Sequence, residues 1–175
     1  MQNLLLQPPA FPGYEVSAVY EPAQEVGGDF YQAVQTKGGT LVVVGDVSGK
    51  GLKAAMVVSL LVGALRARAG LMPAALLAEL NQALAGGMGG GFVTCVAARF
   101  AADGSGWIAN AGHLMPYCDG RELEVASGLP LGLTAVPQSM AATTRMMGCL
   151  KTPTISSNDD SSLPSSLVAS PVSKS

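Results

Sequence analysis

The chain has 175 residues, which is enough for one domain with a substantial hydrophobic core. Hydrophobic residues make up 49% of the chain and charged residues 13%, a composition that excludes a highly charged, disordered protein. Ten Lys and Arg residues stand against twelve Asp and Glu residues, for a net charge of −2, which excludes a nucleic-acid binder that works by neutralising phosphates.

Strands, then two helices, then further strands follow one another along the chain. Aromatic and β-branched residues predict the strands, turn residues such as TKGGT and DGSG separate them, and Pro73 is a good first residue for the second helix. The predicted strands are residues 14–20, 29–34, 41–47, 92–100, 107–111, 115–117 and 122–125, and the predicted helices are residues 52–68 and 73–85.

This element order predicts an α+β fold with antiparallel sheet rather than repeated βαβ units. The helix over residues 52–68 is apolar on most of its faces, so we expect it to be covered on both sides.

The composition changes sharply near Leu133. Residues 134–151 fit either a short helix or no regular structure. Residues 152–175 are mostly Ser, Pro, Thr and small apolar residues without a helical or strand period, which predicts a disordered tail.

The cysteines and the apolar segments indicate in which cellular compartment the protein is found. Three cysteines lie far apart without a CxxC motif, which indicates a reducing compartment and no zinc site. The start of the chain lacks the basic end of a secretory signal, and the most apolar run, residues 54–65, is shorter than the roughly 20 residues of a membrane span. We therefore expect a cytoplasmic protein without a membrane segment; the oligomeric state stays open.

The hairpin over residues 29–47 gives the most specific prediction. If Lys37 and Gly38 form a two-residue turn, Thr36 pairs with Gly39 and Asp29 lies directly opposite Asp46. A three-residue turn would instead place Asp46 opposite Phe30.

Two facing carboxylates repel each other, and a hairpin rarely keeps them without a cation between them. Hard divalent ions such as Mg²⁺ and Mn²⁺ bind oxygen ligands of this kind, and the glycines before each Asp leave room for a close approach. The alternative is that Asp29 and Asp46 are ordinary aspartates at strand ends. As a facing pair they favour a metal site.

The segment GDVSGKG, between a strand and a helix, invites comparison with a phosphate-binding P-loop. A P-loop requires G-x-x-x-x-G-K-[ST], whereas only three residues separate Gly45 from Gly49 here, and Gly51 follows Lys50. The spacing excludes a P-loop nucleotidase.

Six segments occur in the order found in SpoIIE/RsbU-type serine/threonine phosphatases, a bacterial branch of the metal-dependent (PPM-type) protein phosphatases. They are VGGDFYQ (26–32), VVGDVSGKGLKAA (43–55), ELNQAL (79–84), FVTCVAARF (92–100), NAGHLMPY (110–117) and GLPLGL (128–133). The resemblance covers residues 4–133, which defines a phosphatase domain, and leaves residues 134–175 as a non-matching tail.

The resemblance implies a phosphatase 2C-like fold, a sandwich of two antiparallel sheets flanked by helices. It also implies that two Mn²⁺ or Mg²⁺ ions hold a water that attacks a phosphoserine or phosphothreonine. Carried over to this chain, Asp46 would bridge both ions, Asp29 would bind one, and the backbone carbonyl of Val47 would complete a metal shell. The implied partner is a phosphorylated regulatory protein, such as an anti-sigma-factor antagonist.

Two residues inside these motifs have simpler interpretations. His113 is interpreted as a histidine hydrogen-bonded near a turn, and Lys50 as a solvated residue at a helix start.

The chain departs from the family after residue 133. The family has further metal-binding aspartates there, whereas Asp159 and Asp160 are the only acidic residues of this segment, and neither follows an apolar strand. We expect the closing strands of the sandwich to be missing and metal affinity to be reduced. The alternative function is therefore an impaired phosphatase fragment that binds a partner or a single ion without turnover.

Overall fold

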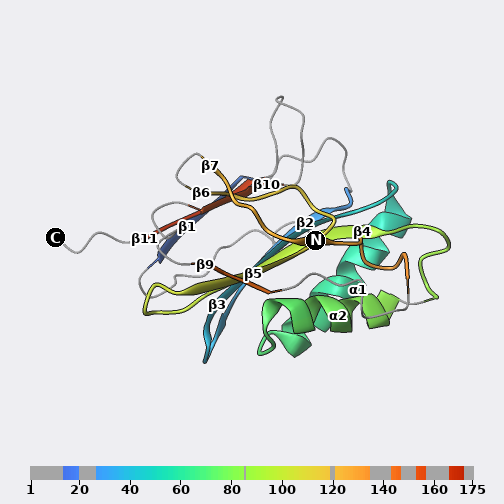
Figure 1. The fold of residues 1–175 in the computed structure, drawn as a ribbon. Coiled ribbons are helices and arrows are strands. Elements are labelled where there is room, and N and C mark those ends of the chain that lie inside the picture. The colour runs from blue at the N-terminus through green and yellow to red at the C-terminus, as the bar shows by residue number, and fades with distance from the viewer. Residues whose placement is uncertain are drawn as a thin grey trace.

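The computed structural model describes residues 14–19, 27–84, 86–118, 121–134, 143–146, 153–156 and 166–171. Figure 1 shows three layers: two helices, a central sheet that they cover on one face, and an outer sheet on the other face. This is the α+β sandwich that the sequence predicted.

The observed elements follow the predicted order closely through residue 111. The helices are α1 (Leu52–Arg68) and α2 (Pro73–Leu84). The strands are β1 (Tyr14–Val19), β2 (Asp29–Thr36), β3 (Gly39–Val47), β4 (Val93–Phe100), β5 (Gly106–Ala111), β6 (Tyr117–Cys118), β7 (Arg121–Glu122), β8 (Ser127–Gly128), β9 (Thr144–Met146), β10 (Pro153–Ser156) and β11 (Ser166–Pro171).

The central sheet has the strand order β2-β3-β4-β5-β8, and β9 also pairs with β5. Its first hairpin has the predicted register, with Thr36 opposite Gly39 and Asp29 opposite Asp46. The left-handed conformation of Gly39 (φ 109°) lets the chain leave the two-residue turn at this point. The expectation of a two-residue turn is therefore confirmed.

The outer sheet has the order β1-β11-β10-β6-β7 and corrects two expectations about the C-terminal segment. Residues 152–175 were expected to contain no regular structure, whereas β10 and β11 lie there and fill the sheet between β1 and β6. The closing strands expected to be missing are thus supplied by this segment. A strand that pairs on both edges leaves few unsatisfied backbone groups, which outweighs its weak sequence pattern.

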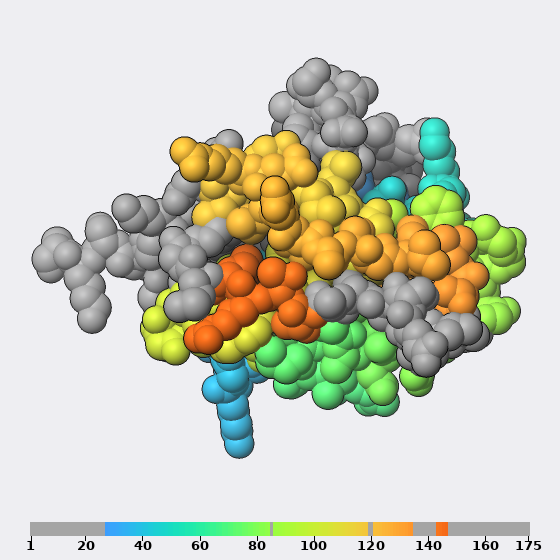
Figure 2. Space-filling model, viewed as in Figure 1, coloured from blue at the N-terminus to red at the C-terminus, as the bar shows by residue number. Residues whose placement is uncertain are grey.

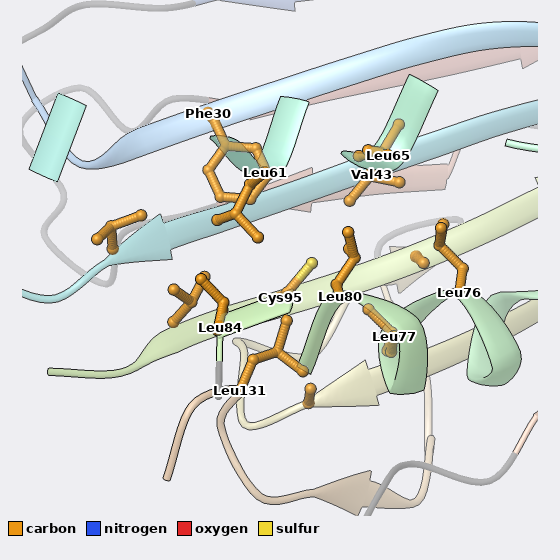
Figure 3. Packing of buried hydrophobic residues seen from close by; sticks show 14 of the residues in the cluster. Phe30, Val43, Leu61, Leu65, Leu76, Leu77, Leu80, Leu84, Cys95 and Leu131 are labelled. Carbon is orange, nitrogen blue, oxygen red and sulfur yellow. The ribbon is translucent and has the colours of Figure 1, made fainter. Parts of the chain in front are cut away.

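The larger hydrophobic core lies between the central sheet and the helices (Figure 3). Leu61 and Leu65 of α1 and Leu76, Leu77 and Leu80 of α2 are fully buried against the sheet. The opposite face of α1 corrects a further expectation, because its apolar side chains are exposed: Leu52 to 76%, Met56 to 66% and Leu60 to 52%. The helix belongs to an outside layer, so only one of its faces can pack.

A second core lies on the other face of the central sheet, around Tyr31, Val44, Val96 and Ile108. Figure 2 shows that the β2–β3 turn (blue) and the β3–α1 connection (cyan) project at opposite ends of the molecule. No helix in the described part of the chain is long and apolar enough to cross a membrane.

Two cysteines of the described residues differ in their chemical state. Cys118 is disulfide-bonded, which the reducing-compartment interpretation did not anticipate. Cys95 is a buried free thiol in the larger core, where burial raises its pKa to about 12. Cys95 therefore packs as a small apolar side chain.

Candidate metal centre

Asp29 and Asp46 lie opposite each other where β2 begins and β3 ends. Val47 and Val93 belong to the core beneath the helices, so the alternation along each strand turns Asp46 to the face that the outer sheet covers. Directly opposite residues on one face have their Cβ atoms roughly 5 Å apart. The two carboxylates therefore share one end of the sandwich.

Burial raises the pKa of Asp46 to about 6, and the negative charge of Asp29 adds to this rise. A hydrogen bond from the backbone N–H of Val47 opposes it. A cation between the carboxylates would oppose the rise far more strongly, because it stabilises their charged forms. The electrostatics of this end of the sheet therefore favour a bound cation.

Gly28 leaves space in which two oxygen atoms converge. A Cβ atom at this position would lie 2.9 Å from Asp46 Oδ1 and closer still to the carbonyl oxygen of Val47. The Val47 N–H also donates to the carbonyl of Gly28 at 3.1 Å, which holds the two segments together. Carboxylate and carbonyl oxygens are the ligands that Mg²⁺, Mn²⁺ and Ca²⁺ prefer, so these residues fit a hard divalent ion.

Within the described residues, no His, Cys, Asp or Glu side chain joins the pair to make a group of three. Asp159 and Asp160, the acidic residues after Leu133, lie outside the described residues. The centre described here thus contains two carboxylates and one nearby backbone carbonyl.

A cavity of about 130 Å³ lies beside Val47, between the β3–α1 connection, the first turns of α1 and the loop before β4. Lys50 and Lys53 contribute to its lining. Lys50 is exposed at the helix start, as its interpretation as a solvated residue expects.

His113 and Thr94 extend the row of polar side chains beside Asp46. Thr94 is directly opposite Asp46 in the β3–β4 register, and its Oγ1 lies 2.9 Å from His113 Nδ1. His113 is buried and follows the turn at Gly112, so its interpretation as a hydrogen-bonded histidine near a turn is confirmed. Thr94 could not be identified from the sequence, because the partner of Asp46 on β4 depends on a pairing across two intervening helices.

The sequence family described as Stage II sporulation protein E (SpoIIE) matches residues 36–146, which is more than half of the chain. The chain belongs to the SpoIIE family. The match includes Asp46, Val47 and His113 and begins after Asp29. The match ends at the last residue of β9, which lies beyond residue 133. The domain boundary expected at residue 133 stays a prediction.

Solved structures of phosphatase domains resemble this SpoIIE-family chain in fold. The RsbU and RsbW domains of Rv1364c from Mycobacterium tuberculosis match with 26% identity and a TM-score of 0.69, over 84% of this chain and 44% of that one. The SiaA-PP2C domain of Pseudomonas aeruginosa matches with 22% identity and a TM-score of 0.61, over 82% and 58%. RsbX, in a complex with magnesium, matches with 13% identity and a TM-score of 0.65, over 85% and 75%.

The SpoIIE-family chain spans less than two thirds of the length of the first two of these structures. No curated protein matches it in sequence. The family model thus shows membership of the SpoIIE family, and the fold is the one found in these solved phosphatase domains.

Proposed function

We propose that this domain is a metal-dependent protein serine/threonine phosphatase in which Asp29, Asp46 and the Val47 carbonyl bind Mn²⁺ or Mg²⁺. The observation that carries the proposal is the register of the first hairpin, which puts two carboxylates side by side at one end of the sandwich. The convergence of Asp46 Oδ1 and the Val47 carbonyl over Gly28 supports it, because both are oxygen donors.

In this proposal the chain supplies position and charge. Asp46 and Asp29 would hold the divalent ions from neighbouring strands, and Gly28 keeps the space beside Asp46 Oδ1 and the Val47 carbonyl open. When bound, the divalent ions supply a water of lowered pKa and neutralise charge on the phosphoryl group. The Val47 N–H helps to hold the Asp46 carboxylate in its charged form, which is the form that binds cations.

The proposed substrate is a phosphorylated regulatory protein, such as an anti-sigma-factor antagonist. The structural neighbour from Mycobacterium tuberculosis combines an RsbU domain with an RsbW domain, which supports a role in a regulatory system of this kind.

A second candidate function is binding without turnover, to one ion or to a partner protein. The two-carboxylate composition of the centre, as far as the structure describes the chain, favours it. Two divalent ions carry more positive charge than two carboxylates compensate, so affinity for at least one ion should fall.

Release of phosphate from a phosphoserine protein, measured while Mn²⁺ is titrated, tests the proposal. We expect Asp46→Asn to reduce the metal-dependent rate by more than about 100-fold, because even residues that only hydrogen-bond metal ligands contribute 10–100-fold. Asp103→Asn is the matched control, since Asp103 lies in the exposed β4–β5 turn, where its carboxylate accepts hydrogen bonds from Ser105.

Phosphate release that EDTA leaves unchanged would contradict the metal-dependent mechanism. A folded wild-type chain that binds Mn²⁺ but releases no phosphate would favour the second candidate.

A further inference from the structure

A continuous row of polar side chains crosses three strands at the end of the central sheet that carries the carboxylates. Asp29 is opposite Asp46, and Asp46 is opposite Thr94. Opposite residues on neighbouring strands point to the same face, so the Thr94 hydroxyl stands next to the carboxylate pair at roughly 5 Å between Cβ atoms. Neighbouring positions on these strands, Val44 and Val96, belong to the apolar core.

The chain continues this row through His113, which reaches Thr94 from the loop after β5. Gly112 turns the backbone there with φ 69°, and a side chain at this position would collide with Pro130, at 2.6 Å from its Cγ. The His113 imidazole then lies 2.9 Å from Thr94 Oγ1 through its Nδ1.

Asn110 holds the backbone of His113 from both sides. Its Oδ1 accepts a hydrogen bond from the His113 N–H at 2.8 Å, and its Nδ2 donates to the His113 carbonyl at 2.9 Å. Asn110 is completely buried and His113 is only 6% exposed. These hydrogen bonds hold the imidazole in one orientation toward Thr94. They also satisfy the polar groups that Asn110 and the His113 backbone bury.

A divalent ion held by few protein ligands keeps several of its waters, which need hydrogen-bond partners of their own. A threonine hydroxyl can donate one hydrogen bond and accept others, but only a hydroxyl with a fixed partner offers them in a constant direction. Thr94 has such a partner in His113, and it is the polar side chain adjacent to Asp46 on β4.

We propose that Thr94 and His113 are positioning residues of the metal centre: His113 fixes the Thr94 hydroxyl, and this hydroxyl holds the water shell of an ion bound at Asp46. The inference rests on the proposed function, since it requires a metal ion at Asp46. It adds two residues whose effect on metal affinity is exerted through hydrogen bonds rather than through direct ligation.

Calorimetric titration of Mn²⁺ into the full chain tests this pair, with the melting temperature of the metal-free protein as a second readout. We expect Thr94→Val to weaken Mn²⁺ binding by about 10–100-fold, and Thr94→Ser, which keeps the hydroxyl, to bind nearly as tightly as the wild-type chain. His113→Leu should weaken binding, and His113→Asn, whose amide can replace Nδ1 toward Thr94, should restore much of it.

Thr36→Val is the matched control. Thr36 lies at the far end of β2, and its hydroxyl accepts a hydrogen bond from Arg99 Nη1 at 2.6 Å. This substitution removes a comparable hydroxyl from the same sheet, so it should lower the melting temperature while leaving the Mn²⁺ affinity unchanged.

Two failures are distinguishable. If the folded wild-type chain binds no Mn²⁺, the metal centre itself is overturned, and this inference with it. If the wild-type chain binds Mn²⁺ and both Thr94→Val and His113→Leu bind it equally tightly, only the inference is overturned. Should Thr94→Val fail to fold, the comparison of His113→Leu with His113→Asn decides the question in the same way.

Discussion

The two ends of the central sheet hold charged side chains with different partners. At the end near the β2–β3 turn, Arg99 is 3% exposed and donates hydrogen bonds of 2.6 Å to the hydroxyl of Thr36 and to the carbonyls of Ala69 and Leu71. At the other end, Asp46 faces a second carboxylate, and a backbone N–H is the group that lowers its pKa.

The difference in partners distinguishes Arg99, whose charge has a structural role, from Asp29 and Asp46, whose charges have a functional role. Arg99 finds its acceptors in the α1–α2 connection, so its charge ties the helices to the sheet within the chain. Asp29 and Asp46 oppose each other and gain from a cation that comes from outside the chain. The buried Arg99 guanidinium stabilises the fold through the hydrogen bonds of its Nη atoms, whereas the like-charged pair of Asp29 and Asp46 favours the binding of a cation.

Substitution of Arg99 tests the structural end and should have the largest effect on stability. Arg99→Met leaves the carbonyls of Ala69 and Leu71 without their donor, so we expect a loss of about 3 kcal/mol in the free energy of unfolding. This corresponds to a fall of about 6–12 °C in melting temperature for a chain of this size. Urea denaturation measures it, with the exposed Arg121→Met as control.

The comparison predicts that folded Arg99→Met binds Mn²⁺ as the wild-type chain does. Weakened binding would show that the two ends of the sheet are coupled.

Addition of metal tests the functional end. Mn²⁺ at 100 times its dissociation constant should raise the free energy of unfolding by about 2.7 kcal/mol, and EDTA should reverse the change. Thermal denaturation with and without Mn²⁺ measures the effect, which should be absent in Asp46→Asn. An equal stabilisation of Asp46→Asn would place the ion elsewhere.

The pH dependence of the metal-free chain should give a smaller effect, because solvent screens the half-buried Asp46 carboxylate. The pKa of Asp46 rises from 3.8 to about 6 on folding, so the folded state holds this proton more tightly than the unfolded state. The contribution of Asp46 to stability is therefore present below about pH 4 and is lost as the pH rises toward about 6.

Asp46→Asn removes this titration. We expect the metal-free variant to gain stability relative to the wild-type chain across this pH range, with little difference below about pH 4. Urea denaturation in EDTA at several pH values measures the difference. A difference that stays constant with pH would contradict the pKa shift as its cause.

The first hairpin could be predicted from sequence because its information is local. The turn at Lys37 and Gly38 determines the register, and the register brings Asp29 and Asp46 together. The bounds of α1 were also predictable, since no proline interrupts residues 52–68 and Gly51 and Gly70 lie just outside the helix.

Pairings between distant segments could not be predicted in this way. Strand β1 pairs with β11, and the weak pattern of Ser166–Pro171 indicates a strand only once its neighbours are known. Thr94 and His113 are 19 residues apart, and their contact depends on the turn at Gly112. The exposed face of α1 was missed because hydrophobicity alone does not show which layers surround a helix.

Substitutions at Gly28 and at the two aspartates should have different consequences during evolution. Replacement of Asp29 or Asp46 removes a negative charge and relieves their repulsion. A protein that evolves from this one can therefore lose catalytic activity and still keep a stable β-sandwich fold. Replacement of Gly28 by any larger residue drives a side chain into the oxygens of Asp46 and Val47 and disturbs the backbone that holds the two segments together. Relatives that have lost catalytic activity should therefore retain Gly28 more often than they retain Asp29 and Asp46.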